Sequence, residues 1–168
     1  MLTSHELFGF MSANLANEIL GFTHESDKPA YKATLNAVAQ ARHVRPVFLE
    51  RQPRAQCHAA IISTLSRPAL EAAAAALIRV WLVKKQRQML VDFLNALGLP
   101  NNEGVVDDLP ATMDDAKLKS AIEALLAKYP GEAVAVYLNA FNDMNEANWA
   151  NLKGLLENDA RLQLGAPA

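Results

Sequence analysis

The fold is decided by one stretch, residues 68–98, which reads PALEAAAAALIRVWLVKKQRQMLVDFLNALG. Alanine, leucine, methionine, lysine, glutamine and arginine dominate it, and these residues lose little side-chain freedom in a helix. Pro68 suits a first helical turn, whereas Gly98 followed by Pro100 is typical of a helix end. We therefore expect one long central helix over about residues 67–97, which either kinks or breaks at Pro68. At about 1.5 Å per residue it would span about 45 Å, more than the diameter of a small domain.

Apolar residues also recur at helical spacing on both sides of this stretch. Phe8, Met11 and Leu15 form one such stripe, and no segment shows the sustained alternation that is typical of a β-strand. A length of 168 residues suits one domain with its own core. We predict an all-α, single-domain bundle of about seven helices around the central helix. The domain would cover residues 1–162 and leave a frayed tail at 163–168.

Composition restricts the compartment in which the protein works. The apolar part of the central stretch is interrupted by Arg79 and is too short for a membrane span, which requires about 20 predominantly apolar residues. Glu6 and Glu18 occupy positions where a secretory signal peptide would be apolar. The single cysteine, Cys57, cannot form an intramolecular disulfide, which favours a reducing compartment. We expect a cytoplasmic protein that has no membrane partner.

Charge is divided unevenly along the chain. The formal net charge is −2, but residues 1–90 carry 11 Lys and Arg against 6 Asp and Glu, which gives +5. Residues 91–168 carry 5 against 12, which gives −7. Such a division indicates a contact between the halves, head-to-tail self-association or a basic binding face. The alternative is that two solvated surfaces merely differ in charge.

We find no residue pattern typical of catalysis, metal binding or cofactor binding. Neither HExxH nor CxxC occurs, and seven scattered glycines form no phosphate-binding loop. Cys57 precedes His58, but neighbouring residues of a helix point about 100° apart, so Cys57 is better interpreted as a small buried apolar residue. The sequence therefore predicts no cofactor and no metal and leans away from an enzyme. The histidines are dispersed over different elements: His5, His24, His43 and His58.

Arg79 and Gln86 are the candidates for binding a small ligand. On a continuous helix Arg79 falls beside Gln86 and Leu90, in the middle of the apolar face. A guanidinium in that position requires an anion, because its desolvation is costly. The anion is either an internal carboxylate or the carboxylate or phosphate of a ligand held between helices.

Leu77 and Trp81 are the candidates for a protein interface. They fall on the opposite side of the expected helix, in line with Lys84 and Gln88. Either another helix covers Trp81, or the side chain anchors a partner, as tryptophan often does in protein interfaces. The partner would be a second copy of the chain or another protein.

Residues 42–54, which read RHVRPVFLERQPR, are the candidate for nucleic-acid binding. Arginines supply phosphate contacts, and the segment holds four of them. Phe48 is the one aromatic residue available for stacking on bases, and the overall pI is about 6.1, so an arginine-rich surface connection is the stronger interpretation. The candidate phosphate contacts are Arg42, Arg45, Arg51 and Arg54.

Three functions follow, in descending order. The first is a non-catalytic, homodimeric module for protein interaction or regulation, supported by the uneven charge and by Leu77 and Trp81. The second is a helical bundle that binds a small anionic ligand through Arg79. The third is weak nucleic-acid binding through residues 42–54.

Overall fold

The chain folds into helices, as the sequence predicts. The computed structural model describes residues 1–165, and within that range the one β feature is an isolated bridge between Asn102 and Val105. The described residues form ten α-helices and two short 3-10 helices, rather than about seven helices. Of the tail expected at 163–168, residues 166–168 lie outside the described residues.

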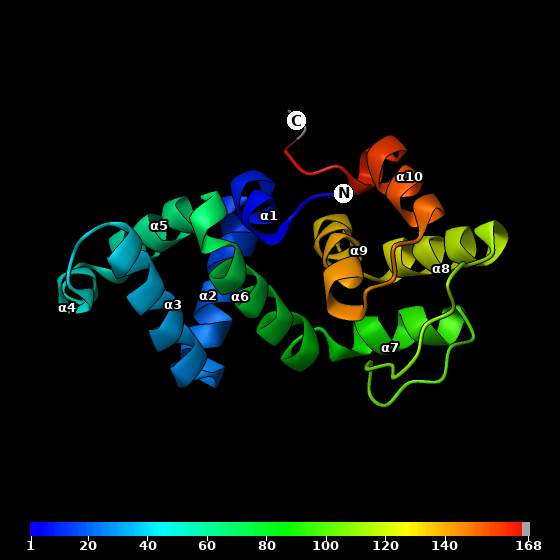
Figure 1. Cartoon of the computed structure of the whole chain (residues 1–168), viewed down its shortest axis with the longest axis horizontal. Helices are drawn as coiled ribbons and strands as arrows, with labels where there is room; N and C mark the ends of the chain where they lie inside the picture. The colour runs from blue at the N-terminus through cyan, green and yellow to red at the C-terminus, as the bar shows by residue number, and fades with distance from the viewer. Residues whose placement is uncertain (166–168) are drawn as a thin grey trace. The chain divides into compact units, whose positions relative to one another are not determined.

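The chain divides into two compact units. The N-terminal unit comprises Leu2–Trp81, and the C-terminal unit takes Met1 and the chain from Leu82 onward. In Figure 1 the colour runs from blue to green along the first unit and from green to red along the second. The single domain expected over 1–162 stays a prediction, and each unit is considered by itself.

The N-terminal unit is built around α3, which packs against α2, α4 and α5, whereas α1 packs against α5 and η1. The buried face of α3 carries Leu35 and Val38, which are 1% and 0% exposed. The elements are α1 (Ser4–Phe10), α2 (Ala13–Ser26), α3 (Lys28–Ala41), α4 (Pro46–Glu50), α5 (Arg54–Leu65), η1 (Pro68–Leu70) and α6 (Glu71–Lys84).

Short polar side chains divide this unit into helices. Thr3 and Glu6 form a capping box at the start of α1. The hydroxyl of Ser12 accepts the backbone N–H of Leu15 at 3.1 Å, so α2 begins where a single longer helix would otherwise continue. Asp27 caps α3 in the same way. These caps explain why the helices are more numerous and shorter than expected.

The C-terminal unit surrounds α9, in which every residue from 133 to 141 is buried. Because its buried residues point all round the axis, α9 is enclosed by its neighbours rather than laid on a surface. It packs against α8, α10 and η2, and α7 packs against α8. The elements are α7 (Arg87–Ala96), α8 (Asp115–Lys128), α9 (Gly131–Asn145), α10 (Ala150–Asn158) and η2 (Ala160–Leu162).

The long central helix expected over residues 67–97 is wrong. Pro68 opens the 3-10 turn η1, α6 follows, and the helix is interrupted at Lys85 and Gln86 before α7 begins. Gln86 has φ −102° and ψ 22°, outside the helical region.

The buried stripes of the two helices explain the interruption. At about 100° per residue, a continuous helix would present these stripes on faces roughly 120° apart. The interruption lets each helix bury its own stripe. The buried positions are Ala74, Leu77, Ile78, Trp81 and Leu82 in α6, and Met89, Leu90, Phe93 and Leu94 in α7.

No single helix within residues 1–165 is long and apolar enough to cross a membrane. Arg54–Leu65 and Pro68–Lys84 meet the criterion only as a pair, across a bend of 103°.

Candidate functional site

Arg79 does not occupy the buried face on which the sequence analysis placed it. It is exposed, because α6 buries the opposite face, which includes Leu77 and Trp81. Gln86 is half-buried in the interruption between α6 and α7. The expectation that the Arg79 guanidinium lies in the core is therefore wrong, because it assumed one continuous helix through residues 67–97.

Leu77 and Trp81 are both 0% exposed, so the mixed, partly polar face expected for them is wrong. The indole N–H of Trp81 is buried and has no hydrogen-bond partner within residues 1–165. Leaving such a donor unpaired costs about 1–3 kcal/mol. Both side chains belong to the apolar interior of the structure rather than to an exposed interface.

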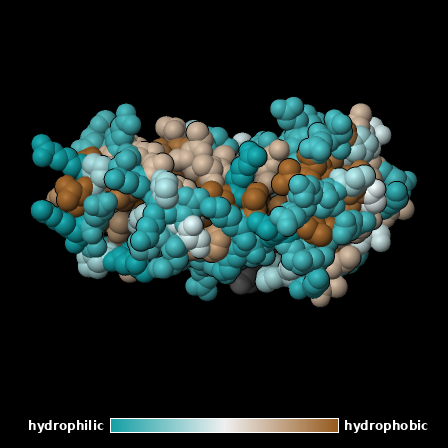
Figure 2. All heavy atoms as spheres, turned by 90° about the horizontal axis from the view of Figure 1, so that it is seen from below, coloured by the Kyte–Doolittle hydropathy of each residue, from teal (hydrophilic) through white to brown (hydrophobic). Residues whose placement is uncertain are grey.

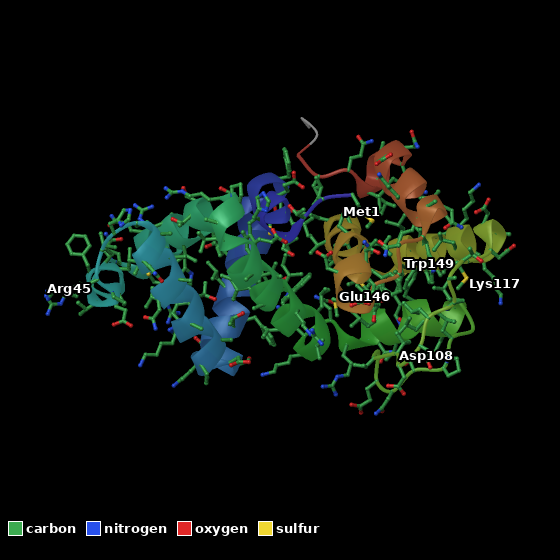
Figure 3. The ribbon with its side chains drawn as sticks, viewed as in Figure 1. Met1, Arg45, Asp108, Lys117, Glu146 and Trp149 are labelled. Carbon is green, nitrogen blue, oxygen red and sulfur yellow. The ribbon has the colours of Figure 1, made fainter. Side chains whose placement is uncertain are left out.

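The four arginines of residues 42–54 are all exposed, but they do not act alike. Arg42 donates a hydrogen bond to Thr64 Oγ1 at 3.3 Å, and Arg54 Nη2 lies 3.3 Å from His24 Nδ1. Arg45 and Arg51 flank α4 as its N-cap and C-cap residues. Figure 3 shows the Arg45 side chain extending away from α4.

The N-terminal unit contains a pocket that the sequence analysis did not identify. It has a volume of about 550 Å³ and lies between α3 and the segment that joins α4 to α5. It is an open pocket with both polar and apolar walls. Its lining residues are His24, Lys28, Tyr31, Lys32, Leu35, Glu50, Gln52, Arg54 and Cys57.

Positive charge predominates in the lining. Lys28 and Lys32 lie one helical turn apart on α3, and Arg54 faces the pocket from the first turn of α5, against the single carboxylate of Glu50. Arg54 also lies 3.8 Å from Glu25, which has an exposed side chain. The pocket therefore holds three cationic side chains and one anionic side chain, an arrangement suited to an anion.

The N-terminus of α5 strengthens this preference. Pro53 occupies the N-cap position and supplies no side-chain hydrogen bond to the first turn. The N–H groups of an uncapped first turn, together with the helix dipole, attract negative charge. Arg54 and Cys57 belong to this turn and line the pocket, so the dipole acts on the same space as the cationic side chains.

A hydrogen-bonded pair of rings lies at the base of the pocket. The hydroxyl of Tyr31 is 3.2 Å from His58 Nε2 and 4.0 Å from Cys57 Sγ. His24 packs edge-on against Tyr31, with ring centroids 4.7 Å apart. His58 is 5% exposed and lies behind the lining residues.

Burial keeps Tyr31, Cys57 and His58 uncharged near neutral pH. Burial, together with Cys57, raises the pKa of Tyr31 to about 12. Burial and then the charge of Arg54 lower the pKa of His58. Burial raises the pKa of the Cys57 thiol, although the Tyr31 hydroxyl opposes the shift. A reactive cysteine requires a lowered pKa, so Cys57 lines the pocket as an uncharged thiol.

The Cys57–His58 pair has the geometry expected from the sequence. Cys57 is a buried, free thiol, as predicted. Tyr31, from another helix, is the partner that the structure gives to the ring of His58. Within residues 1–165, no three His, Cys, Asp or Glu side chains are placed to hold a metal ion.

Comparison with known proteins adds no further constraint. Scans of known protein families, curated proteins and solved structures each found no match.

The pocket wall formed by α3 has a residue pattern that is visible in the sequence. Lys28, Tyr31, Lys32 and Leu35 follow the spacing of one helical face, on which cations and an aromatic ring adjoin the apolar stripe. That pattern alone is also typical of a solvated face. The other half comes from α4 and α5 and required the tertiary structure.

Proposed function

We propose that the N-terminal unit binds a small anionic molecule without catalysing a reaction. The observation that carries the proposal is the pocket of about 550 Å³ in which Lys28, Lys32 and Arg54 face one carboxylate, Glu50. Small-molecule pockets usually have volumes of about 300–1,000 Å³ and combine apolar walls with a few polar groups. This pocket meets both conditions.

The walls indicate the class of ligand. Lysine and arginine recognise carboxylates and phosphates through charge-assisted hydrogen bonds. The Tyr31 ring offers apolar surface beside those cations, and its hydroxyl lies within hydrogen-bond distance of His58. The ligand that fits best is a carboxylate or phosphate attached to a flat apolar group.

The uncharged state of Tyr31 and Cys57 favours ligand binding over catalysis. General acid–base catalysis works best when the pKa of the catalytic group lies near the working pH. The pKa of Tyr31 is raised to about 12, and the pKa of Cys57 is also raised. These groups are suited to orienting a ligand by hydrogen bonds rather than to transferring its protons.

Calorimetric titration with benzoate tests the proposal, and benzamide is the matched neutral probe. Benzoate should bind and benzamide should not, because the two differ in the charge that the pocket recognises. Arg54→Gln should weaken benzoate binding about tenfold or more, since a hydrogen bond to a charged group contributes about 1.5–3 kcal/mol. Inorganic phosphate, which lacks the ring, should bind more weakly than benzoate.

Arg79→Gln is the control, because it removes the same charge from an exposed position of the same unit. It should leave benzoate affinity unchanged. Loss of binding in Arg79→Gln but not in Arg54→Gln would instead support the ligand site predicted from the sequence at Arg79 and Gln86. Equal binding of benzoate and benzamide would contradict recognition of charge.

The homodimeric interaction module stays a second proposal. The observation that favours it is the exposure of Val47 and Phe48, which are 44% and 61% exposed on α4 between two arginines. The same arginines keep nucleic-acid binding as a third proposal, tested by whether affinity falls steeply with salt. A cytoplasmic location also stays a prediction.

A further inference from the structure

Large exposed apolar side chains mark two surfaces outside the pocket. Four such side chains occur within the described residues: Phe10, Val47, Phe48 and Val105. Val47 and Phe48 lie among arginines, whereas Val105 lies among acidic residues. Three of the four thus belong to two surfaces of opposite charge.

The first surface, which we name the α4 surface, consists of Arg45, Val47, Phe48 and Arg51. Phe48 lies three residues after Arg45, the N-cap residue of α4, and three residues before Arg51, its C-cap residue, so both arginines are close to it along the chain. Leu49, which is 2% exposed, fixes the helix to the core from the other side. Figure 2 shows apolar atoms among hydrophilic ones at the left end, where Figure 1 places α4.

The second surface, which we name the acidic turn, consists of Glu103, Val105, Asp107 and Asp108. Asn102 and Val105 exchange two backbone hydrogen bonds of 2.8 and 3.0 Å across a tight turn. Val105 is 52% exposed, and both aspartates that follow it are exposed. Figure 3 shows Asp108 on the connection between α7 and α8.

Residues 102–105 of the acidic turn pack closely against α7. Glu103 and Gly104 have φ values of 52° and 87°, as a turn of the I′ type requires. A Cβ atom on Gly104 would lie 2.7 Å from Leu90 Cβ, so the backbone is in close contact with the helix. Arg87 Nη1 lies 3.2 Å from a Glu103 oxygen and holds the turn from the side. Preorganisation of this kind lowers the entropic cost of binding.

We infer that the α4 surface of one copy of the chain binds the acidic turn of a second copy. Arg45 and Arg51 face Asp107 and Asp108 in this contact, and Phe48 covers the exposed Val105. The N-terminal unit, which carries the basic α4 surface, is positive as a whole, and the C-terminal unit, which carries the acidic turn, is negative. Residues 2–81 carry 8 Lys and Arg against 6 Asp and Glu, or +2, and the chain from residue 82 carries 8 against 12, or −4. When both contacts form between the same two copies, the assembly is a closed homodimer.

A second copy fits these observations better than a nucleic acid does. A polyanion would use the arginines and Phe48 but would leave the exposed Val105 and its carboxylates unexplained. The net charge of −2 also opposes non-specific attraction to a polyanion. The inference deepens the interaction proposal and is independent of the anion pocket, whose lining shares no residue with either surface.

Two charge-reversed variants test the contact. The first carries Arg45→Glu and Arg51→Glu, and the second carries Asp107→Lys and Asp108→Lys. In each variant alone the two surfaces carry like charges, whereas in an equimolar mixture both contacts of a dimer pair opposite charges. Sedimentation velocity over about 1–300 µM covers the range expected for a small, weak interface.

The wild type should sediment with a mass approaching twice 18.3 kDa as concentration rises. Each variant alone should raise the dimer dissociation constant about thirtyfold or more, and the mixture should restore association, because like charges across an interface are strongly unfavourable. Association of the wild type should weaken about tenfold between about 50 and 500 mM salt. Arg67→Glu with Arg79→Glu, an equal charge change at exposed positions, should leave the dimer intact.

Circular dichroism and thermal melting establish that each variant folds. A monomeric wild type at every concentration would overturn the inference, as would a mixture that fails to associate although the wild type does. A monomeric wild type that binds single-stranded RNA through Arg45 and Arg51 would favour nucleic acid instead. Benzoate titration of both variants is a separate readout, so failure of the dimer and failure of the anion pocket are distinguishable.

Discussion

The two units differ in the side chains that form their cores. In the C-terminal unit four aromatic side chains interlock, with Phe141 5.4, 5.9 and 5.3 Å from the ring centroids of Phe93, Tyr137 and Trp149. In the N-terminal unit the buried residues include the polar side chains of His58, Thr34 and Thr64. All four histidines and the cysteine of the chain lie in this unit.

The difference shows how a binding pocket is accommodated. An interlocked aromatic core leaves little space and no titratable group except the deeply buried Tyr137, whose pKa burial raises. A core that includes polar side chains with hydrogen-bond partners from neighbouring helices can open onto solvent without leaving those groups unpaired. The N-terminal unit therefore accommodates an open pocket, whereas the C-terminal unit has a closely packed aromatic core.

The largest expected effect concerns the aromatic core. Phe141→Ala should destabilise the C-terminal unit by about 3–5 kcal/mol, because Phe141 is 0% exposed and its removal leaves a cavity. Phe48→Ala is the matched control and should change stability by less than about 0.5 kcal/mol, since the ring is 61% exposed. Urea denaturation measures both. Similar costs for the two substitutions would remove the contrast between core and surface.

Acidification should weaken the N-terminal unit selectively through His58. Its folded-state pKa is lowered by burial, so below the ordinary value of about 6.5 the unfolded chain binds more protons than the folded chain. The contribution of His58 to stability is therefore present above that pH and is lost below it, by up to about 1.4 kcal/mol per pH unit.

Native-state hydrogen exchange measures this pH dependence separately in each unit. His58→Gln retains a partner for Tyr31 but does not titrate, so the variant should lose less stability than the wild type as pH falls. Parallel pH profiles for the two proteins would show that His58 does not titrate in this range.

The smallest expected effect compares the two tryptophans. Trp149 Nε1 donates a hydrogen bond to the carbonyl of Pro110 at 2.9 Å, whereas the N–H of Trp81 is buried and unpaired. Both side chains are at least 97% buried, so Trp→Phe removes comparable volume at each site. Trp149→Phe should be more destabilising than Trp81→Phe by at least about 1 kcal/mol, because the first removes a hydrogen bond and the second removes an unpaired buried donor. Denaturant titration of both variants measures the difference, and a larger loss in Trp81→Phe would contradict it.

The errors of the sequence analysis share one physical origin. Helix propensity is high throughout residues 68–98, so no local signal separates α6 from α7. Only the change in direction of the buried stripe reveals the interruption, and that change becomes visible once the neighbours of each helix are known. Treating the stretch as one helix placed Arg79 in the core and Trp81 on a mixed face, and both placements are wrong.

By itself the sequence determined the helical class of the protein, because helix propensity and apolar periodicity depend on residues close together in the chain. Tertiary structure decided what depends on distant residues. The Glu71 carboxylate accepts the backbone N–H groups of Ser4 and His5 at 2.9 and 2.8 Å, 67 and 66 positions away. The pocket likewise joins α3 to α5. Periodicity shows which face of a helix is buried, but it carries no information about the helix that buries it.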